Sequence, residues 1–271
     1  MSIERNSPIG VFDSGVGGLT VAREIMRNLP NENIVYFGDT ARVPYGTKSK
    51  ETVLRYSRQI TRFLQTQNVK AIVIACNTAS ALALDSLEKE IDIPLIGVVR
   101  PGAETAVRTT RNKRIGVIAT ESTIHSGLYP EFIKNIDPDI EVFGKACPLF
   151  VPLVEEGWTK DKITLAVIER YLSEMLEKDI DTLILGCTHY PLLRGLIGGY
   201  LGENITLVNP AYETAQSLKR MLLDIGIDNR SDQVGKHRFY ASDSIDRFKR
   251  FADNILPCKV EYAEQIAIEE Y

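Results

Sequence analysis

The stretch Ala71–Ser80, AIVIACNTAS, decides how the surrounding chain folds. An uncharged apolar run ends at Cys76, and Asn77 and Thr78 follow directly. Such a run predicts a buried strand of a parallel sheet, and the polar residues after it predict the start of a helix. The stretch therefore predicts a thiol, an amide and a hydroxyl at the carboxyl end of a central strand.

A second stretch, Thr182–Pro191 (TLILGCTHYP), repeats this pattern, with Cys187 lying 111 positions after Cys76. Residues 8–14 and 114–120 also share an Ile-Gly-Val core at nearly the same offset. Echoes at a fixed offset indicate an internal duplication. If the two halves face each other, the two cysteines oppose one another across a cleft.

The rest of the chain alternates short apolar runs with amphipathic segments, which predicts βαβ units. Such units form an α/β fold with parallel sheets covered by helices on both faces. We expect one helix around 124–135, kinked by Pro130, and a tail that completes one sheet. Expected strands lie at residues 9–12, 34–37, 71–75, 95–99, 115–119, 141–145, 183–186, 205–208, near 239 and at 260–262.

Composition is that of an ordinary globular protein. Of 271 residues, 44% are hydrophobic and 25% are charged, and the formal charge of -4 argues against a nucleic-acid-coating protein. No signal peptide or membrane-spanning run is evident, so we expect a cytoplasmic protein with reduced thiols. The four cysteines form no CxxC pair, which argues against a metal site or a redox pair.

The glycine-rich turn Ser14–Gly18 follows the first expected strand, which ends near Asp13. Backbone N–H groups at such a turn can bind an anion. The dinucleotide fingerprint fails, because Thr20 stands where the last glycine belongs. A bound carboxylate and a purely structural turn both remain open.

Cys76 and Cys187 are both predicted at helix N-termini, where the thiolate is favoured. Asp13 could exchange a proton with the first thiol, and His189, oriented by a carboxylate, with the second. Two such thiols on opposite sides of a carbon would invert a stereocentre without a cofactor. Cys147 and Cys258 lack these surroundings and are predicted to be inert.

Five segments in order, PIGVFDSGVGGLTV, GDTARVPYG, ACNTAS, PLFVPLVEEG and LGCTHYP, lie within residues 8–210. They closely resemble glutamate racemases of the aspartate/glutamate racemase family, which are cofactor-independent enzymes of bacterial cell-wall synthesis. The resemblance implies two doubly wound domains related by a pseudo-two-fold axis, with the active site between them. The domains would be residues 1–98 with 210–271, and residues 99–209.

The resemblance also implies roles for individual residues, with no cofactor and no metal. Cys76 would act as base on D-glutamate and Cys187 on L-glutamate. Asp13 would assist the first thiol, and Glu155 and His189 the second; the motif selects Glu155 over its neighbour Glu156. Substrate contacts would come from Asp13, Ser14, Pro44, Tyr45, Gly46, Asn77, Thr78, Thr120 and Thr188.

Several alternatives stay open at this point. The substrate could be another acidic amino acid such as aspartate, or Cys187 and His189 could serve a hydrolase with one essential cysteine. A protein-binding role toward DNA gyrase, known for some racemases of this family, is a third reading. The family also implies a homodimer, and only seven residues precede Pro8, so we expect no dependence on a cell-wall precursor as activator. The sequence suggests no role for Arg100.

Overall fold

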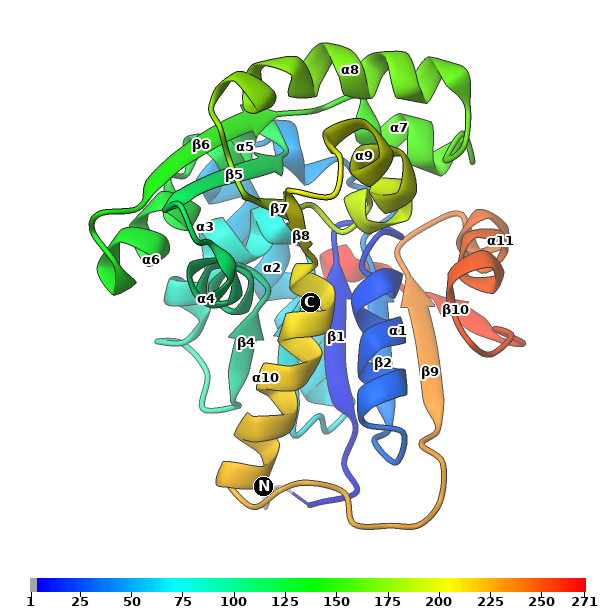
Figure 1. The fold of residues 1–271 in the computed structure, drawn as a ribbon. Helices are drawn as coiled ribbons and strands as arrows, with labels where there is room; N and C mark the ends of the chain where they lie inside the picture. The colour runs from blue at the N-terminus through cyan, green and yellow to red at the C-terminus, as the bar shows by residue number, and fades with distance from the viewer. Residues whose placement is uncertain (1–3) are drawn as a thin grey trace.

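The computed structural model describes residues 4–271, and its first sheet takes strands from both ends of the chain (Figure 1). Six strands lie in the order β10-β9-β2-β1-β3-β4, and all neighbouring pairs are parallel. The bounds are β1 Ile9–Asp13, β2 Ile34–Gly38, β3 Ala71–Ile74, β4 Leu95–Gly97, β9 His237–Ala241 and β10 Ala263–Gln265. The tail of the chain thus completes a sheet, as predicted.

The second sheet has four parallel strands in the order β6-β5-β7-β8. The bounds are β5 Arg114–Ala119, β6 Glu141–Ala146, β7 Thr182–Gly186 and β8 Thr206–Val208. This order repeats β2-β1-β3-β4, since in both sheets the first strand lies between the second and third. The shared topology agrees with the duplication that the sequence echoes indicate.

Helices cover both faces of each sheet, so each sheet separates two apolar cores. Alternation along β1 places Ile9 and Val11 toward α1 (Leu19–Asn28) and α10 (Pro210–Asp224), and Phe12 toward α2 (Lys50–Thr66) and α3 (Asn77–Leu87). All three side chains are fully buried, which contributes about 1.5–3 kcal/mol each to folding. The α-helices are α1 Leu19–Asn28, α2 Lys50–Thr66, α3 Asn77–Leu87, α4 Val99–Thr109, α5 Glu121–His125, α6 Leu128–Ile136, α7 Phe150–Glu155, α8 Lys162–Glu177, α9 Arg194–Leu201, α10 Pro210–Asp224 and α11 Ile245–Ile255.

Helix α10 returns the chain from the second sheet to the first. It packs against both α4 and α1, and in Figure 1 it runs beside α1 in front of the first sheet. The strand order of each sheet reverses between its first and third strands, β1 and β3 or β5 and β7. Ligands of open α/β sheets bind beyond the carboxyl ends of strands at such a point. The residues after these four strands are therefore the place to look for a site.

Three expectations about local structure are wrong. The helix expected around 124–135 is two helices, α5 and α6, separated by Gly127 at φ +68°. Pro130 is the third residue of α6, where the missing N–H costs no intrahelical hydrogen bond, so it causes no kink. The last strand lies at Ala263–Gln265 instead of 260–262, and the short helix α7 was not expected at all.

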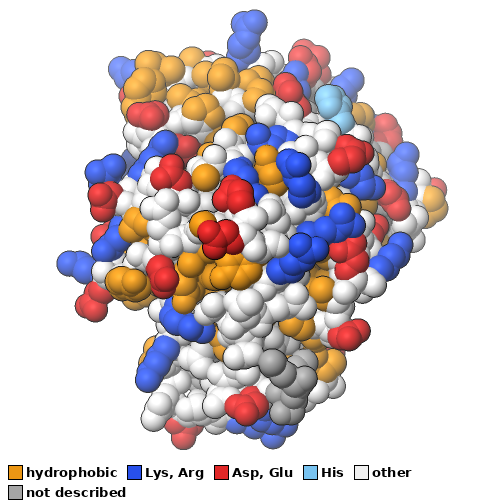
Figure 2. All heavy atoms as spheres, turned by 180° about the vertical axis from the view of Figure 1, so that it is seen from behind, with side chains coloured by type: hydrophobic (Ala, Val, Ile, Leu, Met, Phe, Trp, Pro, Cys, Tyr) orange, Lys and Arg blue, Asp and Glu red, His pale blue; other side chains and the backbone are white. Residues whose placement is uncertain are grey.

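Within residues 4–271, every helix is too short or too polar to cross a bilayer. On the face drawn in Figure 2, basic and acidic side chains are interspersed. Mixed charges of this kind are typical of a solvated protein surface.

Candidate active site

Cys76 lies where the sequence predicts it, at the N-terminus of α3 just after β3. Its Sγ accepts a hydrogen bond from the backbone N–H of Ala79 (3.4 Å) and donates one to Ser14 Oγ (3.5 Å). Burial, aided by the charge of Asp13, nevertheless raises the pKa of this thiol to about 12. The expected thiolate is therefore not favoured here, because desolvation outweighs the helix N-terminus.

Asp13 ends β1 beside this thiol and is fully buried. Its Oδ2 accepts the N–H of Gly15 (3.0 Å), so the glycine-rich turn holds the chain's own carboxylate. Oδ1 has no hydrogen-bond partner among residues 4–271. Burial raises the pKa of Asp13, although the charge of His189 and backbone N–H groups of the turn oppose the shift. A carboxylate in this state is well suited to accept a proton.

Cys187 follows β7, but the helix expected after it is absent at that position. The chain turns through Thr188 and His189 into a 3₁₀-helix, η2 Tyr190–Leu193, and only then into α9. The Sγ atom lies 3.8 Å from Nδ1 of His189. The second thiol therefore depends on a neighbouring imidazole instead of an α-helix N-terminus.

His189 is buried and links Cys187 to Glu155, whose Oε1 lies 3.1 Å from Nε2. Burial would lower the pKa of His189, but its hydrogen bonds to Cys187 and Glu155 raise it to about 10. The pKa of Glu155 is lowered, because the hydrogen bond and charge of His189 overcome burial. The neighbouring Glu156 is exposed, so the structure brings Glu155 and not Glu156 to the imidazole.

The two halves meet through polar residues of both sheets. Thr78, from the first, lies 3.0 Å from Thr120 and 3.1 Å from Thr123, measured between the Oγ1 atoms. The hydroxyl of Tyr129 donates to Asn77 Oδ1 (2.7 Å). After burial and Asp13, the charge of Cys187 is a minor cause of the raised pKa of Cys76, which places the second thiol within electrostatic range of the first.

The Pro44-Tyr45-Gly46 turn also faces the second half, although its tyrosine does not. The carbonyl of Gly46 accepts the hydroxyl of Ser122 (2.7 Å), whereas the buried Tyr45 hydroxyl donates to Asp39. Thr188 joins the interface through its carbonyl, which accepts from Thr20 Oγ1 (3.0 Å). The backbone of the turn, and not the Tyr45 side chain, therefore contacts the second half.

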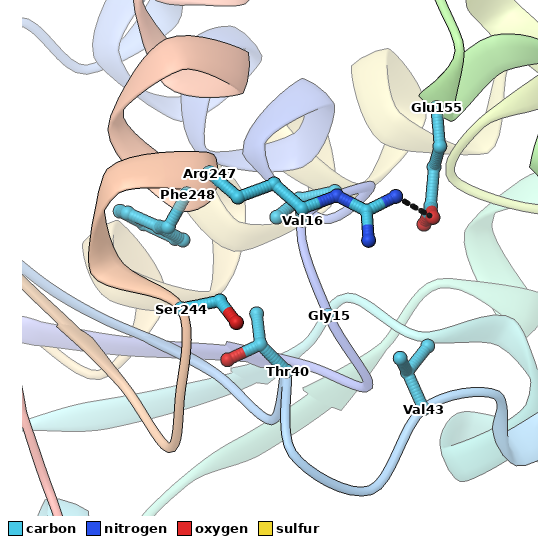
Figure 3. Close-up of a pocket in the computed structure, with 8 residues that line it drawn as sticks. All are labelled: Gly15, Val16, Thr40, Val43, Glu155, Ser244, Arg247 and Phe248. Atoms are coloured by element: carbon cyan, nitrogen blue, oxygen red, sulfur yellow. Dashed lines mark hydrogen bonds and ion pairs between the residues drawn. The ribbon is translucent and has the colours of Figure 1, made fainter.

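A small pocket of about 40 Å³ opens beside these residues (Figure 3). In that view Arg247 extends from α11 toward Glu155, and its Nη2 lies 3.2 Å from Oε2. Neither thiol lines this pocket, and both are buried, with Cys76 5% and Cys187 7% exposed. The lining residues are Gly15, Val16, Thr40, Val43, Glu155, Ser244, Arg247 and Phe248.

The other residues considered in the sequence lie away from the two thiols or belong to no group that could hold a metal ion. Arg100 is exposed on α4, with its guanidinium 5.1 Å from the ring centre of Phe132. All four cysteines are free thiols, and Cys258 is exposed, unlike the buried Cys147. Within residues 4–271, no group of three or more His, Cys, Asp or Glu side chains could hold a metal ion.

Sequence reasoning did not find Thr20, Thr123, Tyr129 or Arg247. Tyr129 and Arg247 lie in helices whose patterns carry no chemical signal, and they reach the site only through contacts between distant segments. Thr123 follows Thr120 by three positions on the same helical turn. This spacing is the one signal that could have suggested it.

Comparison with known proteins agrees with this geometry. The model of the Asp/Glu/hydantoin racemases matches residues 9–218. The chain belongs to this racemase family. A glutamate racemase of Geobacter metallireducens is 49% identical over 261 residues, covering 96% of this chain and 97% of that protein.

Solved structures of the family share the fold closely. A glutamate racemase isoform from Bacillus anthracis superposes with a TM-score of 0.93 at 41% identity, covering 97% of this chain and 98% of that one. The glutamate racemase of Francisella tularensis, solved in complex with D-glutamate, gives a TM-score of 0.92 at 40% identity, covering 98% and 100%. The predicted α/β fold and family membership are thus confirmed.

Proposed function

We propose that this protein interconverts L-glutamate and D-glutamate without a cofactor, using Cys76 and Cys187 on opposite faces of Cα. The observation that carries the proposal is the pairing itself. Each thiol follows the third strand of one of two sheets with the same topology, and each has its own acid–base neighbour. Asp13 serves the first and the His189–Glu155 pair the second.

The two thiols have different acid–base surroundings. Burial keeps the Cys76 thiol protonated near neutral pH, whereas Cys187 has the imidazole of His189 3.8 Å away to exchange a proton with it. The Cys187 thiolate takes the Cα proton of L-glutamate, and the electron pair stays on the substrate. The Cys76 thiol then donates its proton to the opposite face, which yields D-glutamate, a thiolate at Cys76 and a thiol at Cys187.

The reverse reaction, and the return to the starting state, require protons to move at both thiols. Asp13, whose pKa is raised, accepts the proton of Cys76 when this thiol acts as base on D-glutamate. In the same way, His189, hydrogen-bonded to Glu155, accepts the proton of Cys187 and returns it. Each partner therefore assists one thiol.

Glutamate would be held by neutral donors. These are the hydroxyls of Ser14, Thr78, Thr120 and Thr188, the amide of Asn77 and the backbone of the Pro44–Gly46 turn. Neutral donors avoid strong stabilisation of the ground state, which would slow the reaction. Relatives named glutamate racemases, one of them solved with D-glutamate, support glutamate over aspartate as the substrate.

The test is optical rotation in cofactor-free buffer, started from L-glutamate, D-glutamate and both aspartate enantiomers in turn. We expect glutamate from either side to reach a racemic mixture and aspartate to remain unchanged. Turnover of aspartate alone would overturn the substrate assignment. A Cys187–His189 hydrolase would instead leave all four enantiomers unchanged and would not require Cys76.

We also propose that residues 1–98 with 210–271, and residues 99–209, are two domains that separate to admit substrate, because both thiols are buried. From the family we propose a cytoplasmic homodimer that supplies D-glutamate for peptidoglycan. Analytical ultracentrifugation tests the dimer, and rescue of a bacterium that requires D-glutamate tests the supply. A contact with DNA gyrase stays a prediction, tested by a pull-down.

A further inference from the structure

The pocket in Figure 3 contains an ion pair that joins the two halves of the molecule. Nη2 of Arg247, on α11, lies 3.2 Å from Oε2 of Glu155, at the end of α7. Within residues 4–271 it is the one ion pair that connects residues 99–209 to the rest of the chain. The carboxylate of this ion pair, Glu155, also binds His189.

Helix α11 approaches His189 at a second position, one turn further along. The ring of Phe251 lies 6.2 Å from the imidazole, measured between ring centres. Arg247 and Phe251 are four residues apart, so they lie on one face of the helix. This face is therefore directed at the His189 side of the site, although α11 follows β9, a strand of the first sheet.

We propose that Arg247 is a positioning residue for the Cys187 half of the reaction: it fixes Glu155, which orients His189 against Cys187. The inference rests on the proposed function. Each carboxylate oxygen of Glu155 has its own partner: Oε1 binds Nε2 of His189 at 3.1 Å, and Oε2 binds Arg247. A carboxylate held at both oxygens cannot rotate about its last bond, and this fixes the direction of its bond to the imidazole.

The arginine is more than half exposed, with 59% of its side-chain surface accessible, so the direct electrostatic gain is modest. The effect on the reaction comes from orientation. The contact between Cys187 and His189 is long at 3.8 Å, and a small rotation of the imidazole would lengthen it further. Because Arg247 belongs to the part of the chain that carries Cys76, the Cys187 side is aligned only when the two halves are closed.

The experiment measures primary deuterium isotope effects on kcat/KM with glutamate labelled at Cα, in both directions, for wild type and Arg247→Ala. The equilibrium constant between enantiomers is one, so kcat/KM must fall equally in both directions. We expect a fall of about fivefold, the upper end for a partly exposed ion pair. We also expect the isotope effect to rise for labelled L-glutamate and to fall toward one for labelled D-glutamate.

The two isotope effects change in opposite directions because only the proton transfer at Cys187 becomes slower and hence more rate-limiting. General damage to the fold would not separate the two isotope effects. Arg250→Ala is the matched control: it removes the same charge from the same helix, and the Arg250 side chain forms no ion pair with residues 4–271. Arg247→Lys should restore most of the activity, because it returns a charge to Oε2.

Unchanged isotope effects in Arg247→Ala, or a rate equal to that of Arg250→Ala, would overturn the inference. If Arg247→Ala unfolds, Arg247→Gln keeps most of the aliphatic stem, and the same isotope comparison decides. Failure of the proposed function looks different. In that case wild type leaves glutamate unchanged, or racemisation survives loss of Cys76 or Cys187.

Discussion

Gly17→Ala should test how closely the site depends on the packing of Thr188 and His189 against the turn after β1. Gly17 lies in the turn after β1, and a Cβ atom built there would meet Oγ1 of Thr188 at 2.4 Å and Cε1 and Nδ1 of His189 at 2.5 Å. These distances are about 0.9–1.0 Å shorter than an ordinary contact of 3.4 Å. Gly17 is not among the glycines with positive φ, so backbone strain does not contribute.

The new methyl group must therefore displace Thr188 and His189, or the turn, by about 1 Å. A misplacement of about 1 Å costs roughly 100-fold in rate, so we expect kcat/KM for glutamate to fall by about that factor. Overpacking of this kind costs about 2 kcal/mol of unfolding free energy, or roughly 4–8 °C in the melting temperature. The activity and the melting temperature are both measured against wild type.

Gly195→Ala is the control for adding a methyl group, because no atom lies within 4 Å of a Cβ built at that position in α9. It should keep full activity. A folded Gly17→Ala protein with the kcat/KM of wild type would refute the reasoning, since it would show that the positions of Thr188 and His189 do not limit the reaction.

Three further predictions concern residues around the site and the base of the first sheet. Tyr129→Phe removes the 2.7 Å hydrogen bond to Asn77 and leaves a buried acceptor, so chemical unfolding should show a loss of about 1–3 kcal/mol, whereas an unchanged midpoint would contradict it. His189 has its pKa raised from 6.5 to about 10, so its stabilising contribution is complete below pH 6.5 and is lost as the pH rises through 10. The melting temperature of wild type should therefore fall more steeply over that range than that of His189→Gln, and parallel curves would count against the shift. Lys70→Met leaves the carboxylate of Glu32 buried without its 2.6 Å partner, so urea unfolding should show a loss of about 3–5 kcal/mol; a loss below 1 kcal/mol would contradict this.

The sequence predicts the fold and the two thiols because both depend on local patterns. Uncharged apolar runs identify the buried parallel strands, and the echo between Cys76 and Cys187 indicates two equivalent strand ends. The order of the strands in the second sheet agrees with this duplication. These features can be predicted from the sequence alone, since they need only the periodicity of apolar residues and the spacing of the two cysteines.

The rest of the site depends on contacts between distant segments, which periodicity does not report. Asn77 meets Tyr129 across 52 positions, and Glu155 meets Arg247 across 92. The helix that carries Glu155 has only six residues, too few for a recognisable stripe. The sequence also does not predict the protonation state of Cys76, because burial, which decides it, is a property of the fold and not of the strand-to-helix turn.

Solvent deuterium incorporation at Cα of glutamate tests the two-thiol account most directly. It is measured from L-glutamate and from D-glutamate with wild type, Cys76→Ala and Cys187→Ala, while optical rotation is followed in parallel. The account predicts that wild type places deuterium in the inverted product from either side, and that neither variant inverts glutamate. Racemisation at the wild-type rate by either single variant would contradict it.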